Sequence, residues 1–218
     1  VFVIAIQMGA IAAVIYEYWA RLWGAATGIV SGEPQGRRLG IGLILASIPI
    51  VLIGLTFGQT VKQFLFNDIA IAMGLIIGGL IIIWIEKNPP QVRVHEVEEL
   101  SIKDACWIGL IQVLSLIPGT SRSGATIIGA MFLGVSRKAA TEFSFFLGIP
   151  VIIGAGLLDL YQSYDVLNTT EDWTVIAVGL LVSFVSALLL IRALVAYVAK
   201  RDFMIFAWYR IASGLLIL

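Results

Sequence analysis

The stretch LIPGTSRSGAT, residues Leu116–Thr126, places a turn, an arginine and four hydroxyls between two hydrophobic segments. Pro118 and Gly119 favour a break between helices, because proline lacks an N–H donor and glycine tolerates left-handed backbone angles. The residues that follow supply hydroxyl donors, the Arg122 guanidinium and the free N–H groups of a new helix start. Such an array suits an oxyanion, above all a phosphate. This loop is therefore the candidate site.

Composition assigns the chain to the polytopic membrane proteins. Hydrophobic residues make up 60% of its 218 residues and charged residues only 13%, whereas a soluble domain is roughly half apolar and about a quarter charged. The length allows about half a dozen spans of about 20 residues each, packed as a single transmembrane domain over residues 1–218. The zero net charge argues against a nucleic-acid partner. The single Cys106 excludes an internal disulfide and a cysteine-based zinc site.

The ends of the chain predict that it is part of a longer protein. Val1 and Leu218 both lie inside apolar runs. The opening stretch has no basic region and no credible cleavage site, so we read it as a membrane span and not as a signal peptide.

Hydrophobic runs predict simple spans at Val1–Tyr18, Leu39–Phe57, Ile69–Ile85, Ala139–Leu160, Trp173–Val198 and Met204–Leu218. Between the first four we expect a glycine-rich loop at Gly24–Arg38, a short turn at Gln59–Asp68 and a water-soluble loop at Glu86–Lys103. Pro49 should kink the second span. Gly74 and Gly78 form a small-xxx-small pattern in the third span, for which helix packing is the favoured role.

Asp104–Ile117 and Gly124–Leu133 are each too short to cross a hydrocarbon core about 30 Å thick. They form either one broken span or a re-entrant hairpin, and the positive-inside rule separates the two. Three crossings place one group of basic residues on the same side: Arg21, Arg37, Arg38, Lys87, Arg93 and Lys103. A segment that turns back returns Arg137 and Lys138 to that side and leaves Tyr161–Asp172 outside. We therefore predict an all-α membrane helix bundle with a re-entrant helix-loop-helix whose tip lies near the bilayer midplane.

Two features suggest inverted-topology repeats. Ala72–Ile83 lines up without a gap with Ala177–Leu188, although apolar composition alone can produce such a match. The first span and Ala139–Leu160 run in opposite directions, as in inverted repeats, if each follows a re-entrant hairpin. The partner hairpin would then precede Val1.

Two charged positions outside the loop have competing interpretations. Arg210 lies inside the last apolar segment, where an arginine is costly and by default functional. Its partner is either substrate phosphate or a carboxylate such as Glu142. In the alternative without a function, its side chain snorkels to the membrane interface. His95 stands beside glutamates, but there is no second histidine and the spacing fits no strong ligand motif, so we favour a solvated loop over a metal site.

The loop differs from a nucleotide-binding P-loop. GTSRSGAT, Gly119–Thr126, has the two glycines and the final threonine, but Ala125 stands where a lysine is required and no strand precedes it. A serine nucleophile would need a nearby base, which the loop does not supply. What remains is phosphate binding by backbone N–H groups with Arg122 as a bidentate clamp.

PGTSRSGAT, continuing as MFLGVSRKAATEFSFFLGIP, resembles the signature of the bacterial undecaprenyl-diphosphate phosphatases, the bacitracin-resistance membrane phosphatase family. The similarity includes IQMGAIAAV near the start and FAWYR near the end. The resemblance implies an enzyme of the bacterial cytoplasmic (inner) membrane that removes the terminal phosphate of the polyprenyl diphosphate carrier lipid, with a divalent cation, Mg²⁺ or Ca²⁺, so that the monophosphate is reused in cell-wall synthesis.

The resemblance and the residues together give the expected site. Family members carry the PGxSRSxxT residues as active-site groups. We expect catalytic roles for Ser121, Arg122, Ser123 and Thr126, and substrate binding by Pro118, Gly119, Thr120, Gly124 and Arg210. The family also has an N-terminal hairpin with a glutamate-rich motif and a histidine, which this sequence lacks, so we expect the base and the metal ligands there and no activity from these residues alone. The attacking group, a serine or a metal-activated water, stays open, and so does a homodimer.

A transporter or flippase for a lipid phosphate or a small anion is the alternative function. Inverted repeats and a hairpin inside the membrane would suit it equally well. Phosphate release from a polyprenyl diphosphate separates the two, because a transporter would bind the lipid without hydrolysing it.

Overall fold

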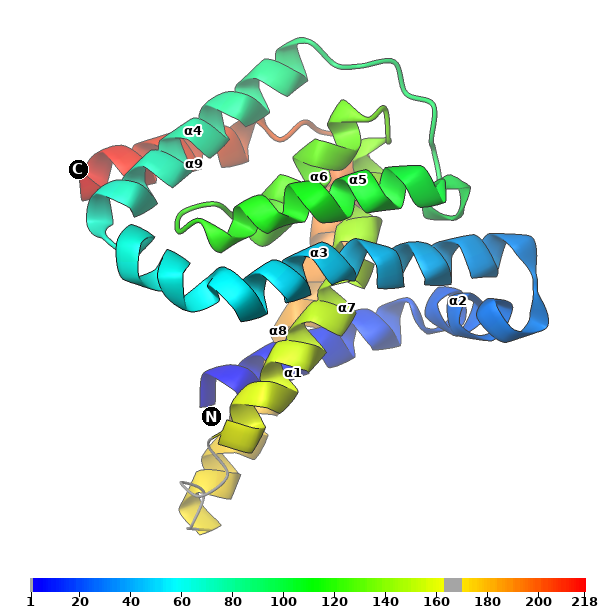
Figure 1. Cartoon of the computed structure of the whole chain (residues 1–218), viewed down its shortest axis with the longest axis horizontal. Helices are drawn as coiled ribbons and strands as arrows, with labels where there is room; N and C mark the ends of the chain where they lie inside the picture. The colour runs from blue at the N-terminus through cyan, green and yellow to red at the C-terminus, as the bar shows by residue number, and fades with distance from the viewer. Residues whose placement is uncertain (1, 163–169) are drawn as a thin grey trace.

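The computed structural model describes residues 2–162 and 170–218, and within these ranges the chain is a bundle of helices (Figure 1). In chain order the elements are α1 (Phe2–Glu17), α2 (Trp19–Ser31), α3 (Pro34–Leu65), α4 (Asp68–Lys87), the 3-10 turn η1 (Val97–Glu99), α5 (Ile102–Gln112), the 3-10 turn η2 (Val113–Leu116), α6 (Arg122–Phe132), α7 (Arg137–Gln162), α8 (Thr170–Val198) and α9 (Met204–Ile217).

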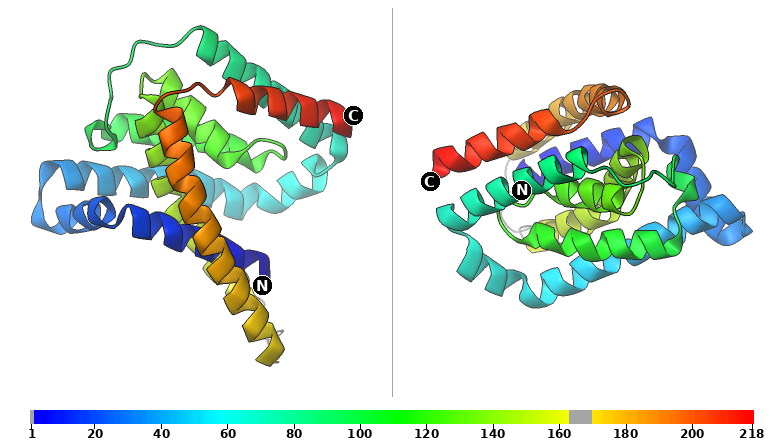
Figure 2. Two further views of the ribbon diagram at one scale, coloured as in Figure 1. Left: turned by 180° about the vertical axis from the view of Figure 1, so that it is seen from behind. Right: turned by 90° about the horizontal axis from the view of Figure 1, so that it is seen from above.

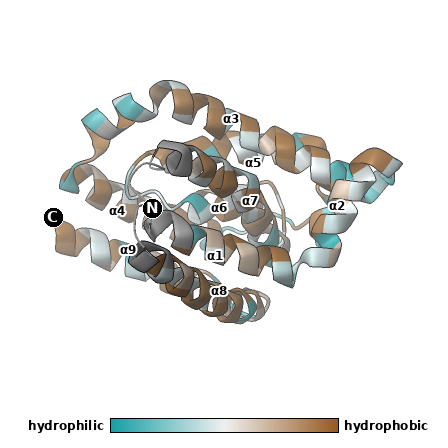
Figure 3. Cartoon of the chain, turned by 90° about the horizontal axis from the view of Figure 1, so that it is seen from below, coloured by the Kyte–Doolittle hydropathy of each residue, from teal (hydrophilic) through white to brown (hydrophobic). Residues whose placement is uncertain are grey.

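Four helices are long and apolar enough to cross a membrane: Pro34–Val61, Asp68–Lys87, Arg137–Leu157 and Thr174–Val198. α1 and α9 are shorter apolar helices. Figure 3 shows hydrophobic colour along most of each helix, with hydrophilic colour gathered near α2 and the end of α3. The expected all-α polytopic membrane bundle is confirmed. The expected outer loop Tyr161–Asp172 falls mostly on residues 163–169, outside the described ranges.

The glycine-rich stretch Gly24–Arg38 is not the loop we expected. Most of it is helical, and Gly32, with a φ of +78°, ends α2 before α3 turns back. The glycines allow two helices to touch: a Cβ at Gly28 would lie 2.7 Å from the Gly36 carbonyl carbon, and one at Gly40 would lie 2.7 Å from the Ala25 carbonyl oxygen. The glycines of this stretch, which suggested a loop, instead allow α2 and α3 to pack closely against each other.

The expected turn at Gln59–Asp68 is also shorter than predicted, because α3 continues to Leu65. α3 passes through Pro49 as one helix. Its successor α4 begins after Asn67, whose side-chain oxygen accepts a hydrogen bond of 2.8 Å from the Ala70 N–H. α3 therefore ends two residues before Asn67, the capping residue of α4.

The segment from α5 to α6 is a re-entrant hairpin. The two helices pack against each other and run in opposite directions (Figure 1). The open end of the hairpin is held together as well, because Val94 and Val135 form a parallel β-bridge and the Ser136 N–H donates to the Val94 carbonyl at 2.8 Å. A segment that crossed the membrane could not bring these two ends together.

The tip of the hairpin lies against the first half of α4. The carbonyl of Pro118 lies against Gly74, and Gly119 lies against Ile71 of α4. Gly74 stands about 9 Å along the axis from the first residue of α4, at 1.5 Å per residue. Along the helix axis, the tip therefore lies between the start of α4 and its middle.

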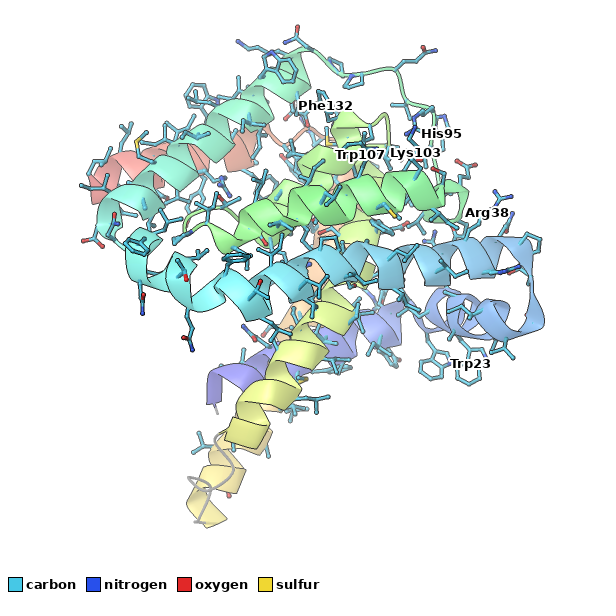
Figure 4. The ribbon with its side chains drawn as sticks, in the orientation of Figure 1. Trp23, Arg38, His95, Lys103, Trp107 and Phe132 are labelled. Atoms are coloured by element: carbon cyan, nitrogen blue, oxygen red, sulfur yellow. The ribbon has the colours of Figure 1, made fainter. Side chains whose placement is uncertain are left out.

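Charged residues gather at the opposite end of the bundle, where the hairpin opens. Figure 4 shows Arg38, His95 and Lys103 at one end of the molecule. Ion pairs there join separate elements: Arg21 with Glu98 and Glu142, Arg137 with Glu86, Arg93 with Asp104, and Lys138 with Glu96. The basic clusters therefore share one side, as the re-entrant topology requires.

The order of helix packing relates the two halves of the chain. α1 packs on α8 and α3 packs on α7, while α1 also packs on α7 and α4 on α9 (Figure 2). Exchanging α1 with α7, α3 with α8 and α4 with α9 leaves this set of pairs unchanged, as an inverted repeat would. The match of Ala72–Ile83 with Ala177–Leu188 pairs α4 with α8, so it does not follow this exchange.

The topology predicts opposite labelling of two exposed glutamines. In a protein with Cys106 replaced by serine, Gln63→Cys at the end of α3 should react in intact cells with a thiol reagent that cannot cross the membrane. Gln91→Cys, beside the open end of the hairpin, should react only after the cells are permeabilised. Labelling of Gln91→Cys in intact cells would contradict the orientation.

The ion pairs predict an acid-sensitive contact between η1, α2 and α7. Burial raises the pKa of Glu98, but hydrogen bonds from Arg21 outweigh it and hold that pKa below its usual value. A lowered folded-state pKa contributes stability above the unfolded pKa of about 4.5, which is lost as the pH falls through the folded value. Glu98→Gln should lower stability at pH 7 by about 1–3 kcal/mol and flatten the acid dependence of the melting temperature.

The control is Lys138→Gln, which removes an ion pair at the same end of the bundle. Lys138 pairs with Glu96 at 3.1 Å, and both side chains are more than one third exposed. An exposed pair contributes little, so this variant should melt close to the wild type. Equal losses in the two variants would show that the Arg21 pair has no special role.

Candidate active site

The first turn of α6 gathers hydrogen-bond donors of the kind that can bind an anion. Gly119 has a φ of +80°, which lets the chain turn before the helix. Ser121 is the N-cap: its hydroxyl accepts the Gly124 N–H at 3.1 Å and lies 3.2 Å from the Ser123 hydroxyl. The other N–H groups of a first helical turn have no partner within the helix and point outward with the positive end of the helix dipole. The serine hydroxyls and the free N–H groups of the first turn of α6 therefore offer hydrogen-bond donors close to one another.

α4 holds this loop through glycine. The Pro118 carbonyl occupies the space where a side chain at Gly74 would begin, and the Ile71 carbonyl does the same at Gly119. These contacts join backbone to backbone, so a larger residue at either position could not be accommodated by side-chain rotation. The position of the loop is thus fixed by the surface of α4.

Arg210 of α9 reaches the same loop. Its Nη2 donates to the carbonyls of Gly74 at 3.1 Å and Gly119 at 3.0 Å. Its Nε is buried and has no hydrogen-bond partner among the described residues. The guanidinium fills the space beside Gly78, and a Cβ added at Gly124 would lie 3.6 Å from its Nη1. Arg210 therefore turns into the protein at the loop and does not snorkel to the interface.

Glu142 is not the partner of Arg210, which corrects one of our two alternatives. Its carboxylate accepts a hydrogen bond of 2.8 Å from Nη1 of Arg21, at the charged end of the bundle. The reason is the direction of the chain: Glu142 lies near the start of α7, whereas Arg210 lies beside the hairpin tip.

The Arg122 side chain extends from the same first turn of α6 toward α7 and not toward α4 and α9. Its Nη1 donates to the Ser144 carbonyl of α7 at 3.2 Å, and its guanidinium lies against Gly148. It lines a separate cavity of about 250 Å³ between α1, α7 and α8. Thr126, one helical turn later, is also directed to α7, where its hydroxyl lies 2.7 Å from the Ser144 hydroxyl.

The structure thus divides the predicted residues into two groups. Ser121, Ser123, Gly124 and Arg210 line a common cavity of about 320 Å³. Thr120 borders a neighbouring cavity with Ser121, Gly124 and Arg210. Pro118 and Gly119 shape the turn. Arg122 and Thr126 face α7 instead, and Thr126 is only 1% exposed. Their catalytic roles stay predictions.

The two arginines dominate the electrostatics of the site. Neither forms an ion pair with a carboxylate within the described part of the chain, whereas Arg21, Arg93, Arg137 and Arg192 all do. Desolvating a cation without a counter-ion is costly inside a membrane protein. An anion bound at the start of α6 would offset that cost.

The residues that the structure describes do not fit a divalent cation at this loop. No group of three or more histidine, cysteine, aspartate or glutamate side chains gathers anywhere in these ranges. The loop itself offers hydroxyls and cations, whereas Mg²⁺ and Ca²⁺ take oxygen ligands with carboxylates prominent among them. We therefore derive no step of the reaction through a metal here.

The sequence did not identify three residues that shape the site. Gly74 and Gly78 were recognised as a pair of small residues, but their favoured role was helix packing, whereas they accommodate the loop and Arg210. Ser144, which contacts both Arg122 and Thr126, gave no signal because it lies in an apolar helix. The role of Ser144 is visible only in the structure, where α7 packs against α6.

Known proteins provide an independent comparison. The family described as bacitracin resistance protein BacA matches residues 1–216. An undecaprenyl-diphosphatase 1 of Acinetobacter baylyi is 82% identical over the whole chain and 80% of its own length. Undecaprenyl-diphosphatases of Psychrobacter cryohalolentis and Rhodospirillum rubrum are 57% and 50% identical, each over the whole chain and 79% of the relative. The chain therefore belongs to the bacitracin resistance protein BacA family.

Proposed function

We propose that the start of α6, with Arg210 on one side and Arg122 on the other, binds the diphosphate of undecaprenyl diphosphate and that the protein removes its terminal phosphate to give undecaprenyl phosphate. The observation that carries this assignment is a helix N-terminus inside a membrane bundle with two arginines that have no carboxylate partner among the described residues. Such a site is complementary to a lipid-linked polyanion. The activity returns the carrier lipid to cell-wall synthesis and accounts for the bacitracin resistance of the family.

The reaction transfers a phosphoryl group to water. Over the whole reaction, the bond from the terminal phosphorus to the bridging oxygen breaks and an oxygen of water becomes bonded to that phosphorus, either directly or after transfer of the phosphoryl group to a serine. The products are inorganic phosphate and the lipid monophosphate, which together take up the protons of water. Catalysis of this transfer depends on positioning and on stabilising charge on the phosphoryl oxygens. Arg210 and the donors around Ser121 are placed to do this on one side of the turn, and Arg122 on the other.

The place of the loop suits a headgroup on the outer side of the membrane. The tip lies beside Ile71 and Gly74, near the start of α4 and far from the basic clusters. A diphosphate in the outer leaflet reaches this depth without crossing the core. Hydrolysis on that side would act on the lipid where cell-wall polymerisation leaves it.

The transporter alternative is separated by a single assay. Purified full-length protein in detergent should release phosphate from undecaprenyl diphosphate, with added Mg²⁺ or Ca²⁺ because we propose that the family's cation requirement applies here as well. Binding of the lipid without release of phosphate would favour a transporter.

Replacing either arginine should impair the reaction. Arg122→Ala and Arg210→Ala should each lower kcat/KM by about 100-fold or more, because a guanidinium at a transferring phosphate contributes several kcal/mol. The corresponding lysine variants should recover little, since lysine lacks the planar fork.

Arg192→Ala provides the control for these variants. Arg192 also lies on a membrane helix, but it is exposed and pairs with Glu17 at 2.7 Å. It should keep wild-type activity. An Arg210→Ala protein within a few-fold of wild type, with an unchanged melting temperature, would remove Arg210 from the site.

A further inference from the structure

A cavity of about 210 Å³ begins at the phosphate-binding turn and runs between α4 and the re-entrant hairpin. Its polar end is formed by Thr120, Ser121, Gly124 and Arg210. The rest of its wall is aliphatic or aromatic and comes from α4, α5, η2 and α6. We call this cavity the hairpin groove; its apolar lining residues are Ile81, Ile82, Trp84, Ile85, Ile111, Leu114, Ala125, Ile128 and Phe132.

The hairpin groove opens sideways toward the lipid. α4 packs on α9 and α6, while α5 packs on α3 and α6, so α6 forms the floor between them (Figure 1). Trp84, Leu114 and Phe132 lie at the rim and are each about half exposed. The rings of Trp84 and Phe132 lie 6.3 Å apart at the end away from the loop. A chain lying in the groove can therefore continue into the bilayer.

Small residues set the width of the groove. Ala125 is the first apolar residue of α6 beyond the polar end. Gly129, one turn later, is close to Ile111: a Cβ there would lie 2.8 Å from the Ile111 side chain. α6 therefore presents a shallow apolar track directly below the anion site.

We propose that the hairpin groove binds the first isoprene units of the polyprenyl chain while the diphosphate lies at the start of α6. This inference rests on the proposed function and adds the recognition of the tail. The occupant follows from continuity, since the same cavity joins Arg210 to an apolar wall and only a ligand with an anionic head and a hydrocarbon tail satisfies both ends. Pockets for drug-sized ligands usually have about 300–1,000 Å³, so the groove holds only the beginning of the chain.

The neighbouring cavity of about 320 Å³ is a poorer place for the tail. It shares Ser121, Gly124 and Arg210 with the hairpin groove but is lined by α4, α6, α8 and α9. Its wall carries the hydroxyls of Ser121, Ser123 and Tyr209. A hydrocarbon chain would lie against more polar groups there than in the hairpin groove, whose hydroxyls are those of Thr120 and Ser121. The hydroxyls of Ser121 and Ser123 instead make this cavity suitable for the phosphate end.

The proposal predicts a dependence on tail length. For the full-length wild type, kcat/KM should rise at least about tenfold from a one-unit to a three-unit prenyl diphosphate, because each further unit buried removes apolar surface from water. Ala125→Leu fills the groove below the anion site and should reduce that ratio at least about tenfold. Ile81→Trp narrows the groove from the exposed face of α4, where a change cannot disrupt the core, and should reduce it as well.

Leu75→Phe is the matched control, because Leu75 lines only the neighbouring cavity. It should keep the wild-type ratio. Loss of the ratio in Leu75→Phe but not in Ala125→Leu or Ile81→Trp would place the tail in the other cavity and overturn the proposal. An equal kcat/KM for both substrates in the wild type would also overturn it. Failure of the wild type to hydrolyse any prenyl diphosphate would instead reject the proposed function.

Discussion

The site depends on one close contact, in which the backbone of the hairpin tip lies directly on the backbone of α4. Glycines at positions 74 and 119 make this contact possible, because neither side has a Cβ to hold the chains apart. Arg210 then bridges the two backbones by donating to one carbonyl from each. Three segments distant in sequence are thereby fixed around the first turn of α6. A loop held in this way can present its donors without reorganising when the substrate arrives, and such preorganisation is the main source of electrostatic catalysis.

The cost of this arrangement is an unbalanced charge. At the opposite end of the bundle, Arg21, Arg93 and Arg137 are each paired with a carboxylate. At the hairpin tip, Arg122 and Arg210 have only backbone carbonyls as acceptors within the described residues. A carbonyl satisfies a hydrogen bond but leaves the charge uncompensated. An anion bound at this site, as we propose, would supply the missing countercharge.

The sequence predicted the membrane bundle, the re-entrant hairpin and the turn at Pro118 and Gly119, since span length, basic loops and helix-breaking residues are local signals. It did not predict α2, because its glycines look like a loop until α3 is placed against them. It also assigned Gly74 and Gly78 to packing in general. Sequence alone could not show that Arg122 and Arg210 lie on different sides of α6, because that depends on the crossing of α4, α7 and α9 around it.

The division between the two arginines has a mechanistic consequence. A helix N-terminus binds an anion along its axis, so groups on both sides of the first turn can contact one phosphate or two neighbouring ones. Arg210 faces the hairpin groove, where we place the lipid tail, whereas Arg122 faces the cavity between α1, α7 and α8. If the tail enters from the groove, the phosphate linked directly to it lies on the Arg210 side and the terminal phosphate projects toward Arg122. Arg210 would then hold the leaving group while Arg122 stabilises the phosphoryl group in transfer. The Arg122 variant should accordingly lose kcat, and the Arg210 variant should also lose part of its affinity for the lipid monophosphate product.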